Sequence, residues 1–425
     1  MTKPLTGSFQ LMKSLNRSLV LTTIRNEGPI SRADIAKRVA LTPPTVTNIV
    51  NELLEERFVV ESEIGHSRGG RKPILLKLNA QAFAIIGIDV GVNTIKSLIT
   101  DLDAGVIGEH KRNLPPYPDE TSFLAELSQC VTELLQAAGG EPAGRSPDGE
   151  LHGHASRRVI GIGVGMHGLV NPEEGVSVFA PNLNLRNIRI RETLEQQFGL
   201  PVYVENDVVA MALAEQWFGG GQQAEHFICV NVGVGVGAGI VLNRQIFHGA
   251  SYAAGEIGHT TIDLNGPRCS CGSYGCLQTL VSGPAIAHAA QTEIALGRPS
   301  SLAQSGAGDL RAITGELVYE AALAGDALAI ETFRKAGRLL GISLTNMIHT
   351  LNPQKIILGG GVAQAGPLLI EPLLETVKSR ALDSSISQLA IETSQLGSRA
   401  TAIGAVTIVL QQLFAQPHFL ERPLG

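Results

Sequence analysis

The chain is 425 residues long, with 44% hydrophobic and 17% charged residues and a formal net charge of −6. This length exceeds one ordinary hydrophobic core and predicts two or three domains, and the composition is that of a globular protein rather than a disordered or fibrous one. No apolar run approaches the ~20 residues that span a bilayer, and Met1 is not followed by a secretory signal, so we expect a cytoplasmic protein with no membrane partner.

Basic charge is concentrated at the N-terminus. Residues 1–80 hold twelve Lys and Arg against seven Asp and Glu, a net +5, so the remaining residues carry −6 − 5 = −11. A basic head on an acidic body indicates that only the head meets a polyanion. A solvated basic face is the alternative.

The N-terminal residues predict three helices. Residues 14–26 place apolar side chains on one helical face, namely Leu15, Leu19, Leu21 and Ile24. Ser31 is the predicted N-cap of a second helix over residues 32–39. Thr42, followed by two prolines, starts a third helix that ends near residue 57. Two short helices joined by a brief turn predict a helix-turn-helix.

A predicted β-hairpin follows, with strands at 58–62 and 74–78 and a glycine-rich basic tip that forms a wing. Small polar side chains on the third helix suit base edges in a major groove, and basic side chains of the tip suit phosphates. The predicted DNA-contacting residues are Thr45, Thr47, Asn48, Arg68, Arg71 and Lys72. Winged helices also bind proteins, but the basic wing favours DNA.

Beyond residue 79 strands and helices alternate. Apolar strands that open into glycines recur at 83–91, 159–165, 227–239 and 355–361, and a polar segment rich in Gly and Pro separates the first two. The recurrence predicts a duplicated α/β fold with a cleft between two lobes.

A cysteine cluster lies in the second half of the chain. Cys269, Cys271 and Cys276 are three of the five cysteines, and His259 precedes the first by ten residues. One imidazole and three thiolates form a closed tetrahedral ligand set, which predicts a structural Zn²⁺ site. The odd cysteine count favours metal binding over disulfides. The alternative, small core cysteines, fits poorly with this turn-rich segment.

These motifs together resemble the ROK family of repressors and sugar kinases. The residues that carry the resemblance are Glu256-Ile-Gly-His259, Cys269-Ser-Cys271-Gly-Ser-Tyr-Gly-Cys276, Asp89-Val-Gly91, Glu205-Asn206-Asp207 and Leu351-Asn-Pro-Gln-Lys-Ile-Ile-Leu-Gly-Gly-Gly361. The resemblance implies a winged helix-turn-helix at 1–80, then a two-lobed, actin-like (hexokinase-type) α/β fold. Its small lobe would span 81–205, and its larger lobe, 206–425, would carry the zinc site and a dimerisation surface. A homodimer or homotetramer is implied.

The resemblance also implies residue roles. In ROK kinases the Asp of the Asn-Asp pair is the general base, which is Asp207 here, and the implied sugar-binding residues are Asn182, Asn206, Asp207, Glu256, His259 and Gln278. The kinases usually carry Glu at the position of Gln278, so the charge is absent here. The implied zinc ligands are His259, Cys269, Cys271 and Cys276.

The phosphate-binding stretches depart from the kinase pattern. Val92 and Asn93 stand where the kinases have Gly-Thr, and Val234 replaces a Thr, although Gly359–Gly361 is retained. We therefore expect a non-catalytic, sugar-responsive repressor of carbohydrate metabolism genes. It would bind operator DNA through the head and a sugar or sugar phosphate in the interlobe cleft. The alternatives are an ATP-dependent sugar kinase that keeps a DNA-binding head, with Asp207 as its base, and a body that docks a sugar-transport protein.

Overall fold

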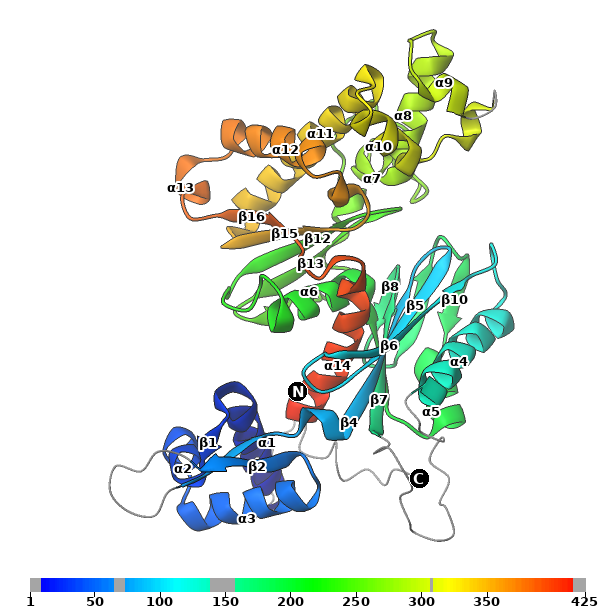
Figure 1. Ribbon diagram of the computed structural model, residues 1–425. Coiled ribbons are helices and arrows are strands. Elements are labelled where there is room, and N and C mark those ends of the chain that lie inside the picture. The colour runs from blue at the N-terminus through cyan, green and yellow to red at the C-terminus, as the bar shows by residue number, and fades with distance from the viewer. Residues whose placement is uncertain (1–8, 65–72, 138–156, 306–308, 416–425) are drawn as a thin grey trace. The chain divides into compact units, whose positions relative to one another are not determined.

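The computed structural model describes residues 9–64, 73–137, 157–305 and 309–415. Two compact units make up the chain (Figure 1): unit 1 comprises Met1–Glu205 with Ala405–Gly425, and unit 2 comprises Asn206–Gly404. The expected three-part division at residues 80 and 205 stays a prediction. None of the helices in the described ranges is long and apolar enough to cross a membrane.

The head of unit 1 is a winged helix-turn-helix, as predicted. Its elements are α1 (Phe9–Glu27), β1 (Ile30–Ser31), α2 (Arg32–Val39), α3 (Pro43–Glu55), β2 (Val59–Ile64) and β3 (Ile74–Leu78). The strands form a sheet in the order β1-β3-β2. Both predicted caps are present, because the Ser31 hydroxyl accepts from the Asp34 N–H and the Thr42 hydroxyl accepts from the Thr45 N–H.

The buried face of α1 differs from the predicted one. Leu21 and Ile24 are buried as predicted, but Leu15 and Leu19 are 51% and 46% exposed. Val20 is fully buried in their place. Helical periodicity alone therefore gave the wrong edge of the apolar stripe, since α1 packs against both helices and against β3 of the head.

The rest of unit 1 is built on a five-stranded sheet in the order β11-β7-β4-β5-β6. The elements are β4 (Phe83–Val90), β5 (Thr94–Thr100), β6 (Val106–Asn113), α4 (Glu120–Ala137), β7 (Arg158–Met166), β8 (Leu169–Asn171), β9 (Val176–Ala180), β10 (Leu185–Ile188), α5 (Ile190–Phe198) and β11 (Val202–Asn206). Strands β4 and β7 are parallel neighbours, with Val90 opposite Met166. Apolar side chains of α4 and α5 join the core of this sheet.

The head contacts the remainder of unit 1 through aromatic side chains and through α1. The Phe58 and Phe83 rings stack with centroids 4.1 Å apart. Helix α14 (Ala400–Ala415) brings Phe414 to α1, where the Ser18 hydroxyl donates to the Phe414 carbonyl and the Arg25 guanidinium lies 5.1 Å from the centre of the Phe414 ring. Arg25 also has a lowered pKa, because it is largely removed from water, and Asp103 opposes this shift.

Unit 2 contains a second five-stranded sheet in the order β14-β13-β12-β15-β16. Its strands are β12 (Phe227–Val232), β13 (Val236–Leu242), β14 (Gln245–Ile246), β15 (Lys355–Gly359) and β16 (Ala390–Thr393). Its main helices are α6 (Asp207–Phe218), α7 (Gln278–Val281), α8 (Gly283–Ala295), α9 (Leu302–Ser305), α10 (Gly315–Leu323), α11 (Ala327–Leu351), α12 (Pro367–Arg380) and α13 (Asp383–Ile386). Each unit thus repeats a strand-rich α/β plan, which confirms the predicted two-lobed fold.

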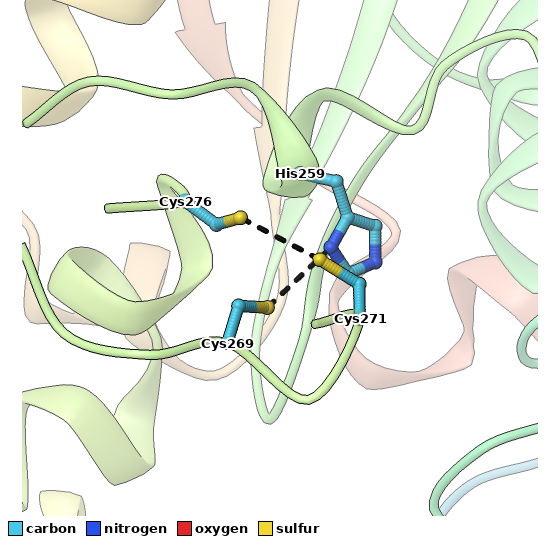
Figure 2. Close-up of side chains that lie close together, drawn as sticks. All are labelled: His259, Cys269, Cys271 and Cys276. Atoms are coloured by element: carbon cyan, nitrogen blue, oxygen red, sulfur yellow. Dashed lines mark hydrogen bonds between the residues drawn. The ribbon is translucent and has the colours of Figure 1, made fainter. Parts of the chain in front are cut away.

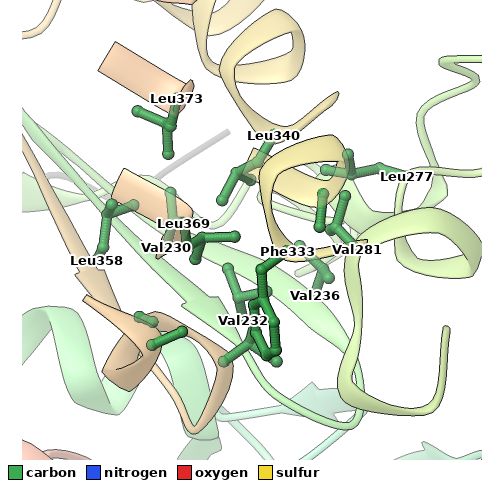
Figure 3. Packing of buried hydrophobic residues seen from close by; sticks show 14 of the residues in the cluster. Val230, Val232, Val236, Leu277, Val281, Phe333, Leu340, Leu358, Leu369 and Leu373 are labelled. Atoms are coloured by element: carbon green, nitrogen blue, oxygen red, sulfur yellow. The ribbon is translucent and has the colours of Figure 1, made fainter. Parts of the chain in front are cut away.

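The core of unit 2 joins the sheet to α11 and α12. Figure 3 shows Phe333 and Leu340 of α11 with Leu369 of α12 beside Val230 and Val232 of the central strand β12. All five side chains are at most 2% exposed. Leu277, at the end of the cysteine-bearing loop, and Val281 of α7 belong to the same core.

Candidate metal centre and ligand-binding residues

Four side chains of unit 2 converge as the sequence predicted. His259 ends a short 3₁₀ turn (Ile257–His259), and Cys269, Cys271 and Cys276 lie in the loop before α7. Their four ligand atoms all lie within 4.8 Å of one another, and the side chains point toward a common centre (Figure 2).

Tight turns bring these cysteines together. The Cys269 N–H donates to the Ser273 carbonyl at 2.7 Å, and the Gly272 N–H donates to the Cys269 carbonyl at 3.0 Å. Gly275 has φ of +64°, and a Cβ there would lie 1.6 Å from the Asp263 carbonyl oxygen. Only glycine fits that position, so the loop depends on it.

The spacing of the ligand atoms fits zinc. Zn–S bonds of about 2.3 Å and Zn–N bonds of about 2.0–2.1 Å in a tetrahedron place two sulfurs about 3.8 Å apart and a sulfur and a nitrogen about 3.6 Å apart. The structure has Cys271 Sγ 3.7 Å from Cys276 Sγ and Cys269 Sγ 3.6 Å from His259 Nδ1. Two of the separations thus match a tetrahedral zinc site, and all the ligand atoms lie within 4.8 Å of one another, so the cluster is suited to a zinc ion.

The thiols differ in acidity when no metal is bound. Burial disfavours the thiolate of Cys269, but hydrogen bonds from the Cys271 backbone and from neighbouring side chains lower the pKa of Cys269 to about 6. Burial and the adjacent thiols raise the pKa of Cys276 to about 12. One thiolate therefore forms readily, whereas three together need a cation between them.

Two further side chains contact the cluster. Glu256 Oε2 lies 3.8 Å from His259 Nε2, the ring nitrogen that faces away from the cysteines. This distance is longer than a hydrogen bond, so the Glu256 carboxylate acts on the imidazole electrostatically. The Gln278 amide donates to Cys269 Sγ at 3.3 Å. This second contact was not predicted, because nothing in the sequence indicated which way the side chain at the start of α7 points.

Asn206 and Asp207 lie at the N-terminus of α6. The Asn206 Oδ1 accepts from the N–H groups of Val208 and Val209 at 2.9 and 3.1 Å, so this oxygen caps the helix. Asp207 begins the helix, where the helix dipole favours a carboxylate. Burial raises the pKa of Glu256, with Asp207 adding to the rise and His259 opposing it, so the two carboxylates interact electrostatically.

The predicted sugar-binding residues fall into two groups. Five belong to unit 2, namely Asn206, Asp207, Glu256, His259 and Gln278, whereas Asn182 belongs to unit 1. Within unit 2, Glu256 interacts electrostatically with both His259 and Asp207. Asn182 is exposed in the turn that follows β9. Its role as a sugar ligand stays a prediction.

The structure describes three of the six predicted DNA-contacting residues, those on α3. Thr47 and Asn48 are exposed on α3, and Thr45 is half-buried. The Thr45 hydroxyl pairs with that of Thr42 at 2.8 Å, and the Thr47 hydroxyl donates to the Pro43 carbonyl at 2.9 Å. Arg68, Arg71 and Lys72 lie outside the described residues. Asn48 therefore offers an exposed side-chain amide on α3, the predicted recognition helix.

Comparison with known proteins extends these findings. The sequence model of the ROK family matches residues 149–412, and that of the MarR family matches residues 13–63. The xylose repressor of Caldicellulosiruptor bescii is 33% identical over 97% of this chain and 100% of its own. The DNA-binding transcriptional dual regulator NagC of Escherichia coli is 32% identical over 95% of this chain and 94% of its own.

Solved structures agree. A ROK family transcriptional regulator, a homologue of the Escherichia coli MLC protein, superposes with a TM-score of 0.82 at 30% identity, over 97% of this chain and 99% of its own. A ROK family glucokinase from Streptomyces griseus superposes with a TM-score of 0.66 at 28% identity, over 76% of this chain and 98% of its own. The regulator thus matches the head as well as the body, and the chain belongs to the ROK family, with the domain plan of its transcriptional regulators.

Proposed function

We propose that this protein is a sugar-responsive transcriptional repressor that binds operator DNA in the cytoplasm. One observation carries the proposal: a winged helix-turn-helix and a ROK body occupy one chain, as in the repressors that match it over almost their full length. Relatives named as xylose and N-acetylglucosamine repressors make these two sugars the first to test.

The head supplies the DNA-binding surface. Helix α3 presents Thr47 and Asn48 to solvent, and an Asn on a recognition helix can pair with adenine in the major groove. Arg68, Arg71 and Lys72 of the predicted wing add phosphate contacts. In a homodimer two such heads would bind a pseudo-palindromic operator, one half-site each.

Unit 2 supplies the core of the sugar site. Glu256 and Asp207 provide carboxylate acceptors, and Asn206 adds a polar side chain at the start of α6. Sugars present several hydroxyls, so a wall of fixed donors and acceptors recognises them strongly and rejects analogues that lack one hydroxyl. His259 and Gln278 complete this set in our proposal.

Zinc has a structural role in this proposal. His259, Cys269, Cys271 and Cys276 use all four positions of a tetrahedral ion, so no position stays open for a reacting water. When bound, the metal fixes the turn that bears Glu256 against the start of α7. The sugar-binding side chains are then held in place before the ligand arrives.

Helix α14 offers a route from the sugar site to the head. Its residues Ala400–Gly404 belong to unit 2 and its later residues to unit 1. Its last turn carries Phe414, which contacts Ser18 and Arg25 of α1. A change in unit 2 on sugar binding can therefore reach the DNA-binding head through one continuous helix.

The proposed repressor is not a kinase. Val234 is 50% exposed in the β12–β13 turn, where ROK kinases carry a Thr, and Val92 occupies the turn after β4. The Val234 side chain lacks the hydroxyl donor of a Thr, and Val92 puts a branched side chain where a Gly lets the backbone approach a phosphate. A coupled phosphorylation assay with ATP and a sugar panel tests this directly, and sustained turnover that Asp207→Asn abolishes would establish the kinase instead.

Fluorescence anisotropy tests the repressor. Labelled DNA from the region upstream of the protein's own gene is titrated with protein, with and without D-xylose or N-acetyl-D-glucosamine. The proposal expects DNA binding that Asn48→Ala weakens and that one sugar alters. Linkage requires the DNA to change the affinity for that sugar by the same factor. Unchanged DNA affinity across the sugar panel would contradict sugar control.

A further inference from the structure

The predicted recognition helix α3 ends at a tight junction within unit 1. Helix α3 stops at Glu55, and the N–H groups of Arg57 and Phe58 donate back to the carbonyls of Leu54 and Leu53 at 3.0 and 2.9 Å. These two bonds form a Schellman motif, in which the residue that turns the chain has a positive φ and is usually glycine. Here that residue is Arg57, with φ of +66°. A side chain disfavours this conformation, so surrounding contacts have to hold it.

Asn79 provides two of these contacts. Its side-chain Nδ2 donates to the Arg57 carbonyl oxygen at 2.9 Å, and its backbone N–H donates to the Phe58 carbonyl oxygen at 2.9 Å. Asn79 directly follows β3, so one residue at the exit of the head binds two successive carbonyls at the end of α3. The first bond uses the side-chain amide as its donor, which an aliphatic side chain of similar size cannot replace.

The same junction is attached to the sheet of unit 1. The short 3₁₀ turn Ala80–Ala82 connects Asn79 to β4, which begins at Phe83. The Phe83 ring stacks on the Phe58 ring with centroids 4.1 Å apart and planes 9° from parallel, and both side chains are 3% exposed. The Leu102 N–H, in the turn after β5, donates to the carbonyl at the start of the 3₁₀ turn at 3.2 Å. Buried contacts and hydrogen bonds therefore hold both ends of the connection.

These contacts restrict how the head can move on the sheet. Domains joined by an exposed linker normally move relative to each other, unless the contact between them is large and apolar. Here the connection is three residues long, and a buried aromatic stack bridges it. The direction of α3 is therefore set by the sheet of unit 1 rather than by free rotation about the linker.

We propose that Asn79 is a positioning residue that holds α3 at one angle to the sheet of unit 1, so that the protein accepts operators with one spacing between their half-sites. The inference rests on the proposed function, in which a homodimer places one head on each half-site. One added base pair moves a half-site by about 3.4 Å and turns it by about 35° around the DNA axis. Heads held at a fixed angle follow that displacement poorly, whereas heads on a loosened joint follow it readily.

Asn79→Leu tests the proposal, because leucine has a similar size and no donor. The matched control is Asn26→Leu, which makes the same replacement at an exposed position of α1 in the same head. An operator is first selected from random DNA with the wild type, and a second duplex carries one extra base pair between the half-sites. Fluorescence anisotropy then gives the affinity of each protein for both duplexes.

The wild type and Asn26→Leu should bind the selected operator on the order of tenfold or more tightly than the longer duplex, because only the first lets both heads bind at once. Asn79→Leu should bind the selected operator about 2- to 10-fold more weakly than the wild type. It should bind the two duplexes within a few-fold of each other. Phe83→Leu, which removes the stacked ring, should shift the preference in the same direction and decides the question if Asn79→Leu does not fold.

The outcomes distinguish the two proposals. If the wild type selects no DNA, the proposed function fails and the inference fails with it. If the wild type binds both duplexes equally tightly, or if Asn79→Leu keeps the wild-type preference, the inference alone is overturned. A lower melting temperature of Asn79→Leu, with the affinity for both duplexes reduced by the same factor, would give Asn79 a purely structural role, also against the inference.

Discussion

Loss of one zinc ligand should destabilise unit 2 by a predictable amount. Cys271 is the suitable ligand to remove, because its side chain is exposed whereas those of Cys269 and Cys276 are buried. Cys271→Ser therefore leaves the apolar core unchanged and breaks the tetrahedral set. In the wild type, Cys271 Sγ lies 3.7 Å from Cys276 Sγ. Because the variant no longer holds the metal ion, the remaining thiols lose the cation that would stabilise them as thiolates.

The magnitude follows from mass action. An ion that binds the folded state at a free concentration about 1,000 times its Kd stabilises that state by about 4 kcal/mol. Unit 2 spans Asn206–Gly404. For a domain of that size 1 kcal/mol shifts the melting temperature by about 2–4 °C, so loss of zinc should lower it by roughly 8–16 °C.

Differential scanning calorimetry measures the shift, and a colorimetric zinc assay gives the metal content per chain. The matched control is Cys130→Ala, which removes a buried thiol of unit 1 outside the cluster and should leave one zinc per chain. Adding a chelator to the wild type should reproduce the lower melting temperature of Cys271→Ser. One zinc per chain in Cys271→Ser after dialysis, with an unchanged melting temperature, would refute the proposed metal site.

Three further predictions concern other contacts. Gln278→Glu should lower zinc affinity by about 10- to 100-fold in a competition titration, because a carboxylate has no proton to donate to Cys269 and repels its thiolate. Gln278→Met only removes the donor, so its zinc affinity should fall by less. Asp326 caps α11, so Asp326→Ala should destabilise by about 1 kcal/mol in urea unfolding and Asp326→Asn by less. Burial raises the pKa of Asp326, but hydrogen bonds from Ala329 and from the serines at 300–301 outweigh it and lower this pKa from 3.8 to about 2. The difference in stability between the wild type and Asp326→Asn should therefore hold above pH about 4 and vanish as the pH falls toward 2. Phe414→Leu should reduce the effect of sugar on DNA affinity while leaving sugar affinity itself unchanged, and an unaltered sugar effect in anisotropy would argue against α14 as the route.

Elements with local signals were predicted well from the sequence. Ser31 and Thr42 cap their helices through contacts three residues away, so α2 and the start of α3 were predicted at their observed positions. The cysteine loop was predicted for the same reason, because its ligands lie within a few residues of one another. His259 lies ten residues before Cys269, and it was predicted as a ligand because one imidazole completes a tetrahedral set with three thiolates.

Features decided by tertiary contacts were missed. Strand β6 is an exposed edge strand without apolar alternation, so its sequence gave no strand signal. The exposure of Leu15 and Leu19 depends on where the rest of the head packs around α1. The capping role of Asn206 was predictable, since an Asn directly before a helix is a common N-cap. Its role as a sugar ligand, which the resemblance implies, stays a prediction.

Gln278 links the metal centre to the choice between sensing and catalysis. In ROK kinases this position usually carries a Glu, whereas here the amide donates to Cys269 Sγ, a contact that a carboxylate cannot make. Glu256 interacts electrostatically with Asp207, so a further carboxylate would add negative charge to a site that already holds two acids and three thiols. The neutral amide of Gln278 therefore adds no repulsion to these groups, and its hydrogen bond to Cys269 helps to hold the cysteine-bearing loop. A kinase would need the acidic site to favour proton removal by its base. A sensor needs only a fixed set of hydrogen-bonding groups. An amide suits a sensor, because it can both donate to the thiolate and accept from a sugar hydroxyl.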